Sequence, residues 1–406
     1  MQAQTYQPKT IQFEGDTDYS NEELLNASGL KSGTALTVAD MNEHTKQLMD
    51  MGVFQDISFS FNGQDLIFKI IPAAVLVPPR FENLPLDTGK ALDDRLRARF
   101  PLYRGKLPAD GTLLDSVRKE LDDELKAEGI DATLLVAPFT DPKTDKITAI
   151  SFTITIPEIR LGEVQVEGAS PALAAEAARA VTHLAGSAYS NEGSISQIET
   201  GLANFYAERG YLEVTTHTAI KGSIVADAQG AHVPFTATVT EGTQFKLASI
   251  KLAPGLIVSQ GDFDKQSGLH PGDIVSLTKL RAEWEFVGRQ YHNKGMVRAR
   301  ILPTATLNLT GATAAYTVDV EPGPVYAMGT LTVENVTDDL RAAIIQAFPV
   351  HTGATFDEGA IASMTAIHDA DSALERVFAN NNLRYVLKLH DDTHIVDLVL
   401  SLERKH

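Results

Sequence analysis

The sequence lacks cysteine, carries few positive charges and has no long apolar run, and each lack excludes a class of protein. With no cysteine among 406 residues, the chain has no disulfide, no thiolate nucleophile and no sulfur ligand for a metal. Its 35 Lys and Arg residues face 53 Asp and Glu residues, which gives a formal net charge of −18. This balance disfavours nucleic acid and anionic lipid as partners, because both are bound by cationic side chains.

No stretch of the sequence resembles a membrane-spanning helix. The longest uncharged run, residues 301–318, is interrupted by Pro303 and Gly311 and is rich in Thr. It predicts two strands of a hairpin and not a helix of about 20 apolar residues. Residues 1–5 contain no basic segment leading into an apolar one, so no signal peptide is visible. We expect either a cytosolic protein or a mature chain that begins at an added Met1.

A repeated junction organises the chain. A predicted helix ends at a glycine, and an alternating strand follows, at Gly52, Gly129, Gly210 and Gly295. Asn382 stands at the fifth such place, and the spacing is roughly 77 to 87 residues. Gly and Asn favour the left-handed conformation that closes a helix. The residues four and eight positions upstream are apolar in nine cases of ten and share one helix face: Leu48, His44, Leu125, Leu121, Tyr206, Leu202, Tyr291, Val287, Phe378 and Leu374.

A short alternating strand opens each repeat. The clearest examples are residues 11–15 and 164–168, and weaker ones are residues 331–335, 250–252 and 80–83. Period-two alternation is typical of a strand with one buried face. Another helix and a glycine loop then precede the second helix, which we expect to begin at Ser190, Ser276 or Asp357 in three of the repeats. Two strands follow each junction, so the repeat is predicted as β-α-α-β-β.

This repeat resembles the polypeptide-transport-associated (POTRA) domain. The resemblance rests on the strand at 164–168, the helix end at 207–211 and the boundaries at 241–242 and 321–323; residues 48–57 are similar to a junction of the BamA-type outer-membrane assembly family. It implies an α+β fold of five tandem POTRA-like domains, each a three-stranded mixed sheet with two helices on one face. The predicted domains are residues 8–75, 76–158, 159–242, 243–323 and 324–406.

The resemblance also implies a function. Such domains form a periplasmic arm, associated with the outer membrane in the full-length protein, which usually precedes a β-barrel. No alternating membrane strands follow residue 402 here. We therefore expect a fragment without signal peptide and barrel, or, as the alternative, a natural barrel-free protein that acts as an envelope scaffold for protein partners.

The edge strands are the predicted binding sites. In the resembling family the strand after the second helix lies at a sheet edge, where unpaired N–H and C=O groups can bind an extended peptide by β-augmentation. The expected partners are unfolded outer-membrane polypeptides and periplasmic accessory proteins, with no nucleic acid and no small-molecule substrate. The edge residues predicted to bind them are Ile57, Phe59, Phe61, Glu213, Val214, Thr215, Val297, Arg298, Ala299, Arg384, Tyr385 and Val386.

Other polar clusters have simpler interpretations. His390 and His394 could bind a metal, but a solvated hairpin turn is favoured, and His44 is expected to be a partly buried, hydrogen-bonded histidine. Arg95, Arg97, Arg99, Arg104 and Lys106 could contact lipid headgroups or an acidic partner, but interleaved Asp residues favour an ordinary helix surface. Residues 268–273 lack the spacing of a phosphate loop and predict a helix–helix turn. We predict no catalytic, cofactor or metal site and therefore no enzyme.

Overall fold

The chain is built from small layers of helices on sheets. The computed structural model describes residues 4–15, 18–365 and 373–404; the predicted last boundary, at residue 406, lies outside them. The chain divides into two compact units, one of residues 1–203 with 215–240 and the other of residues 204–214 with 241–406. None of the helices in the described part is both long and apolar enough to cross a membrane.

Five sheets within the described residues share one topology. In each, the first strand pairs in parallel with the last strand, which also pairs antiparallel with the strand between them in sequence. The first strand and the strand after the second helix therefore occupy opposite edges. These sheets and their covering helices confirm the predicted α+β class of three-stranded mixed sheets. The number of five domains and their boundaries stay a prediction.

The first two sheets contain the N-terminal repeats. Phe68 is fully buried in the first sheet, where its ring lies 5.0 Å from that of Phe13 and 5.7 Å from that of Phe59. The first sheet comprises β2 (Thr10–Glu14), β5 (Asp65–Pro72) and β4 (Phe54–Phe61), with α1 (Asn21–Ser28), α2 (Val38–Met49) and a ribbon of β1 (Thr5–Tyr6) and β3 (Leu36–Thr37). The second comprises β6 (Pro79–Phe81), β8 (Ile147–Ile156) and β7 (Thr133–Thr140), with α3 (Lys90–Arg99) and α4 (Thr112–Ala127).

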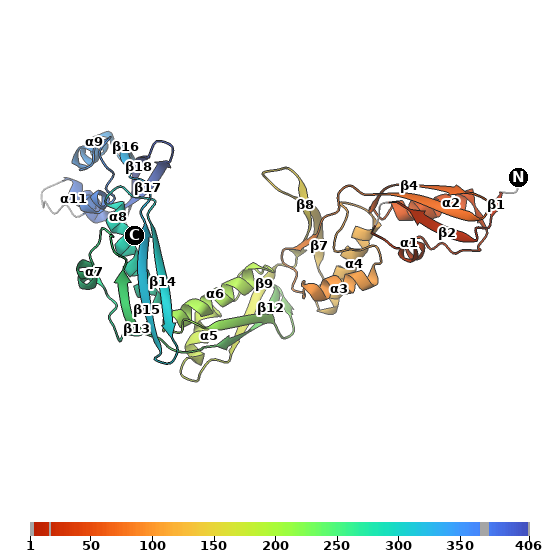
Figure 1. Ribbon diagram of the computed structural model, residues 1–406, viewed down its shortest axis with the longest axis horizontal. Coiled ribbons are helices and arrows are strands. Elements are labelled where there is room, and N and C mark those ends of the chain that lie inside the picture. The colour runs from red at the N-terminus through yellow and green to blue at the C-terminus, as the bar shows by residue number, and fades with distance from the viewer. Residues whose placement is uncertain (1–3, 16–17, 366–372, 405–406) are drawn as a thin grey trace. The chain divides into compact units, whose positions relative to one another are not determined.

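The third sheet has an additional strand. Its central strand, β12, carries β9 on one side and both β10 and β11 on the other. Figure 1 shows α6 along one face of β9 and β12. The elements are β9 (Ile159–Glu167), α5 (Ala174–Thr182), α6 (Gly193–Ala207), β10 (Thr215–Ile220), β11 (Val225–Asp227) and β12 (Gly230–Thr240).

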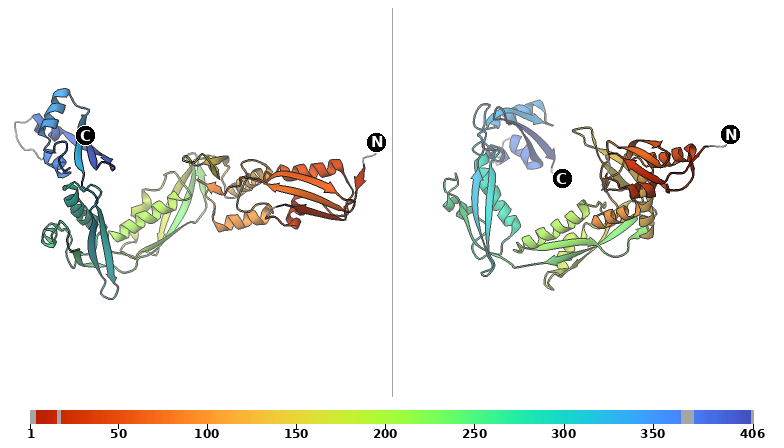
Figure 2. Two further views of the ribbon diagram at one scale, coloured as in Figure 1. Left: turned by 45° about the horizontal axis from the view of Figure 1, so that its top comes forward. Right: turned by 45° about the vertical axis from the view of Figure 1, so that its right-hand side comes forward.

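The fourth and fifth sheets belong to the second compact unit. Figure 2 shows α8, in teal, along one face of the strands of the fourth sheet. The fourth sheet comprises β13 (Lys246–Leu252), β15 (Thr313–Glu321) and β14 (Arg300–Asn308), with α7 (Gln260–Gln266) and α8 (Leu277–His292). The fifth comprises β16 (Ala327–Glu334), β18 (Ile395–Arg404) and β17 (Asn381–His390), with α9 (Asp338–Ala347), α10 (Gly359–Thr365) and α11 (Ala373–Asn380). The antiparallel pair β14–β15 confirms the hairpin predicted from residues 301–318.

The repeated glycines end their helices as predicted, but the asparagine does not. Gly52, Gly129, Gly210 and Gly295 have φ values of 79°, 84°, 82° and 79°, a region that glycine enters without a steric penalty. Asn382 instead lies inside β17, paired with Glu403. The prediction was wrong there because α11 runs directly into the strand, and the Asn381 side-chain amide caps the helix by donating to the Val377 carbonyl at 2.8 Å.

Two of these glycines also hold the start of the next sheet. The Gly210 carbonyl accepts a hydrogen bond of 2.8 Å from Phe245 N, and the Gly295 carbonyl accepts one of 2.9 Å from Tyr326 N. A Cβ on Gly210 would lie 2.7 Å from the Phe245 oxygen, and one on Gly295 would lie 2.9 Å from the Tyr326 oxygen. Gly210 and Gly295 therefore need to be glycine for two reasons: the left-handed backbone conformation and the close approach of the next strand segment.

Candidate functional site

The predicted binding residues fall partly inside the edge strands. Ile57, Phe59 and Phe61 lie in β4, Thr215 begins β10, and residues 384–386 lie in β17. All three strands occupy sheet edges. The β4 side chains point into the first sheet's core, since Ile57 is buried and Phe59 packs on Phe68. A partner at β4 would therefore meet the backbone and not these side chains.

The remaining predicted residues precede their strands. Glu213 and Val214 come before β10, and Val297, Arg298 and Ala299 come before β14, so their assignment to edge strands was wrong. After Gly210 and Gly295 the chain makes one more turn before the strand begins. Hydrogen bonds close these turns, from Leu212 N to Gly210 O at 3.1 Å and from Ala299 N to Met296 O at 2.9 Å.

In the first, fourth and fifth sheets, side chains from the first helix of the repeat bond to the opposite edge. Asn21 pairs with β2 through both its amide atoms, accepting from Phe13 N at 2.9 Å and donating to Ile11 O at 3.1 Å. Gln260 pairs with β13 in the same way, accepting from Leu252 N at 2.9 Å and donating to Ile250 O at 3.1 Å. In the fifth sheet, Arg341 Nε donates to Val333 O of β16 at 3.0 Å. These contacts satisfy backbone groups that would otherwise attract another strand.

Loops between the two helices bond to the beginning of the first strand in the third, fourth and fifth sheets. The backbone N–H of a loop glycine donates to the first strand in each case: Gly186 to Leu161 O at 2.7 Å, Gly272 to Leu247 O at 2.8 Å and Gly353 to Met328 O at 2.7 Å. Residues 268–273 form such a loop between α7 and α8, which confirms the predicted helix–helix turn. The edges formed by β9, β13 and β16 are therefore partly satisfied from within.

The edges formed by the strands that follow the second helices differ in how many of their backbone groups are already bonded. In β10, Thr218 N donates to the Glu199 side chain at 2.9 Å, which closes part of that edge. Pro303 removes one N–H from β14, and β4 has a register shift between Phe54 and Asp56. By contrast, all ten residues of β17 pair with β18 without a shift, and β17 contains neither Pro nor Gly. Among the described strands, β17 is thus the longest regular edge of this kind.

A groove accompanies β17. Tyr385 and Val386 of this strand are 44% and 59% exposed. Beside Leu383 and Tyr385 lies a cavity of about 770 Å³ between α8, the beginning of β14 and α10. The apolar side chains on its wall are Trp284, Ala299, Ile301, Ile361, Ala362 and Leu383, and Glu285, Arg289, His292, Asn293, Glu358 and Tyr385 supply the polar atoms.

The histidines singled out in the sequence have protein partners. His44 Nδ1 lies 2.7 Å from Ser28 O, and the residue is half-buried, as predicted. His390 Nε2 lies 2.9 Å from Asp397 Oδ2. The backbone N–H of Thr330 and the His390 ring lower the pKa of Asp397 to about 2. Within the described residues, His, Asp and Glu side chains do not gather in groups of three or more that could hold a metal ion.

Three arginines of the basic cluster form an ion-paired helix surface, in agreement with the sequence. The acidic partners lie on α3 itself and on α4, at N–O distances of 2.6 to 3.0 Å. Paired charges of this kind on an exposed surface contribute little to stability. The pairs are Arg95 with Glu124, Arg97 with Asp93 and Arg99 with Glu120.

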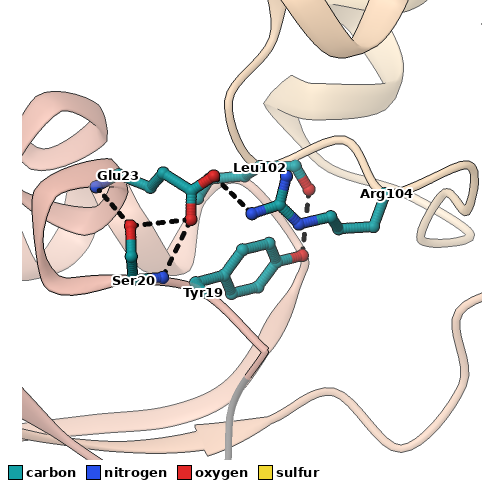
Figure 3. Close-up of polar contacts among 5 residues, drawn as sticks. All are labelled: Tyr19, Ser20, Glu23, Leu102 and Arg104. Atoms are coloured by element: carbon teal, nitrogen blue, oxygen red, sulfur yellow. Dashed lines mark hydrogen bonds and ion pairs between the residues drawn. The ribbon is translucent and has the colours of Figure 1, made fainter. Parts of the chain in front are cut away.

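Arg104 lies beyond the end of α3, so its assignment to the helix surface was wrong; it stands at the joint between the first and second sheets (Figure 3). Its guanidinium forms an ion pair with Glu23 and lies 5.5 Å from the Tyr19 ring centroid. Glu23 also closes the capping box of α1 by accepting from Ser20 N at 2.8 Å, and this bond, with help from Arg104, lowers the pKa of Glu23. The Tyr19 hydroxyl donates to Leu102 O at 2.9 Å. The Glu23 carboxylate thus caps the start of α1 and also links the first sheet to the second.

Comparison with known proteins shows what the chain is similar to. Residues 6–72 match the POTRA family, described as a surface antigen variable number repeat. The chain is 21% identical over 335 residues to the outer membrane protein assembly factor BamA of Buchnera aphidicola, a match that covers 77% of this chain and 51% of the relative. The chain thus spans about half the length of that curated relative.

The chain also aligns with solved structures, at low identity and with TM-scores below 0.5. The third to fifth POTRA domains of Haemophilus influenzae BamA align with 62% of this chain and 100% of their own, at 15% identity and a TM-score of 0.46. The N-terminal domain of Omp85 from Thermosynechococcus elongatus aligns with 62% of this chain and 99% of its own, at 16% identity and a TM-score of 0.24. The chain is a tandem array that resembles the POTRA domains of BamA-type outer-membrane protein assembly factors, and its residues 6–72 match the POTRA family directly.

Proposed function

We propose that this chain is a periplasmic protein-binding arm in outer-membrane protein assembly or secretion. In this role it receives extended segments of unfolded outer-membrane proteins, and of accessory partners, by strand addition. The edge of β17 is the main binding site, and the more interrupted edges of β4 and β14 are secondary sites. The similarity to a protein named as an outer membrane protein assembly factor supports the setting.

The regular, open edge of β17 is the observation that carries this proposal. An added strand gains most of its affinity from main-chain hydrogen bonds, so the edge accepts many sequences. Alternate side chains of that strand would lie on the groove side, beside Leu383 and Tyr385, and the others on the opposite face, beside Arg384 and Val386. Transmembrane β-strands alternate apolar and polar residues with this period. The edge therefore suits such strands before they fold.

Photo-crosslinking tests the site in the whole chain. A photoreactive amino acid is placed at Arg384 on the open edge, and a matched one at Thr332 on β16, the strand at the opposite edge of the same sheet. Both positions are exposed. With a urea-unfolded outer-membrane polypeptide as the partner, we expect crosslinks at position 384 and few at 332, because Gly353 and Arg341 already bond to β16.

The outcomes separate strand addition from the scaffold alternative. Equal crosslinking at both positions, or none at position 384, would contradict the proposal. Crosslinks to folded envelope proteins at position 384, together with none to unfolded polypeptides, would instead favour a scaffold. The joints at Gly295 and Arg104 would suit such a scaffold, since each fixes two neighbouring sheets of the same compact unit.

A further inference from the structure

Three side chains link the edge strand β17 to a helix of the preceding sheet. His292, in the last turn of α8, has its Nδ1 atom 2.7 Å from Glu358 Oε2. The other carboxylate oxygen of Glu358, which lies just before α10, accepts a hydrogen bond of 2.7 Å from the Tyr385 hydroxyl on β17. The three residues come from separate elements of the fourth and fifth sheets. They can connect only while these two sheets are docked.

The electrostatics favour this hydrogen-bonded chain. The bond to His292, followed by the bond to Tyr385, lowers the pKa of Glu358 and keeps it a carboxylate. The bond to Glu358, with burial, raises the pKa of Tyr385 to about 12, so its hydroxyl remains a donor. The Glu358 side chain is only 19% exposed. Partial removal from water strengthens hydrogen bonds to a charged group.

A second contact lies just after the C-terminal end of β17. Arg298, just before β14, forms an ion pair of 2.8 Å with Asp391 in the hairpin that follows β17. Asp391 also accepts a hydrogen bond from the Tyr326 hydroxyl. The joint therefore has two separate attachments along β17. Releasing the one at Tyr385 would leave the one at Asp391 in place, so the fifth sheet could rotate without separating.

Strand addition acts directly on the first attachment. Tyr385 is 44% exposed and lines the groove. Side chains on a neighbouring antiparallel strand have Cβ atoms about 4.5–5.5 Å from those directly opposite, so a side chain of an added strand would contact the Tyr385 ring and compete with Glu358 for its position. We propose that the His292–Glu358–Tyr385 chain couples strand addition on β17 to rotation of the fifth sheet against the fourth. This coupling rests on the proposed function, because it assigns a regulatory consequence to the same edge.

Distance measurements between two spin labels test the coupling in the full chain. Because the chain has no cysteine, Lys279→Cys on α8 and Asp339→Cys on α9 provide two labelling sites, both at exposed positions. The probe is a ten-residue peptide with alternating apolar and polar residues. We expect a narrow distance distribution that becomes about twofold broader when the peptide binds, because an attachment between docked elements is lost.

Removing one hydroxyl provides the decisive variant. Tyr385→Phe should have the broad distribution without peptide and should show no further change with it. It should bind the peptide at least as tightly as the parent chain, because binding no longer has to break the attachment. Tyr316→Phe, which removes a hydroxyl from β15 elsewhere in the unit, should behave like the parent. His292→Phe should match Tyr385→Phe.

The outcomes distinguish the coupling from the binding itself. An unchanged distribution in the parent with peptide bound, or a narrow one in Tyr385→Phe, overturns the coupling. If the peptide does not bind the parent, strand addition fails as a function and the coupling fails with it. In that case a broad distribution in peptide-free Tyr385→Phe would still locate the attachment between the sheets.

Discussion

Proline at one of two neighbouring positions in β17 is expected to weaken strand addition strongly and leave the sheet folded. In a strand, successive N–H groups point to opposite sides. Of Tyr385→Pro and Val386→Pro, one therefore removes an N–H that faces the open edge, and the other removes an N–H that pairs with β18. The first should weaken peptide binding at least about tenfold, or ~1.4 kcal/mol. The second should destabilise the fifth sheet by about 1–3 kcal/mol, through an unpaired β18 carbonyl.

Side-chain effects are separated by alanine controls. Tyr385→Ala and Val386→Ala remove the same side chains but retain both N–H groups, so each should bind more tightly than the proline variant that keeps the fold. Peptide affinity is measured by fluorescence anisotropy, and sheet stability by hydrogen exchange of β16–β18. If the proline variant that retains the sheet binds the peptide as the parent does, main-chain pairing at β17 is wrong.

Replacing a repeated glycine with alanine should lower the free energy of unfolding by an amount that depends on which atoms the new Cβ would meet. Gly129 and Gly295 have nearly the same φ, 84° and 79°. A Cβ on Gly129 would meet nothing within 4 Å, whereas one on Gly295 would lie 2.9 Å from both Tyr326 O and Thr355 Cγ2. Both substitutions place Ala in the left-handed region, at about 1–2 kcal/mol. Gly295→Ala should cost a further ~1–3 kcal/mol because the next sheet must shift.

The location of the effect distinguishes a joint from a simple helix end. Because a chain with several sheets need not unfold in one step, stability is measured by hydrogen exchange resolved to segments. Gly295→Ala should increase exchange in α8 and also in β16, whose sheet docks through Tyr326. Gly129→Ala should affect α4 and β7 only. Equal costs, or an effect of Gly295→Ala confined to α8, would show that the glycine serves its helix alone.

Most of the fold could be predicted because its signals are local and repeated. A helix-ending glycine, apolar residues four and eight positions before it and a short alternating strand at the start of each repeat all act over a few residues. Their recurrence at Gly52, Gly129, Gly210 and Gly295 predicted the order of helices and strands, and the resemblance to the POTRA domain implied the three-stranded mixed sheet. The predicted helix end or strand start was wrong where the backbone can end a helix or begin a strand in more than one way. At Asn381 a side-chain cap replaces a left-handed residue, and after Gly210 and Gly295 one more turn delays the strand.

The closed edges were missed, although the sequence contains a signal for two of them. Asn21 and Gln260 each stand eight residues after the strand N–H that they accept from and ten after the carbonyl that they donate to. An amide at the first position of the first helix, at this spacing, could have been recognised. Contacts such as Arg104 with Glu23 and Tyr385 with Glu358 join residues 81 and 27 positions apart. No local pattern predicts them, because docking of separate elements creates them.

Residue-resolved amide exchange of the whole chain, with and without a strand-like peptide, tests the central claim most directly. Strand addition predicts that alternate amides of β17, those facing the open edge, become protected when the peptide binds. The intervening amides, already paired with β18, and the amides of β16 should change little. Protection spread evenly over the groove without this alternation, or protection of β16 in place of β17, would contradict binding by main-chain pairing at this edge.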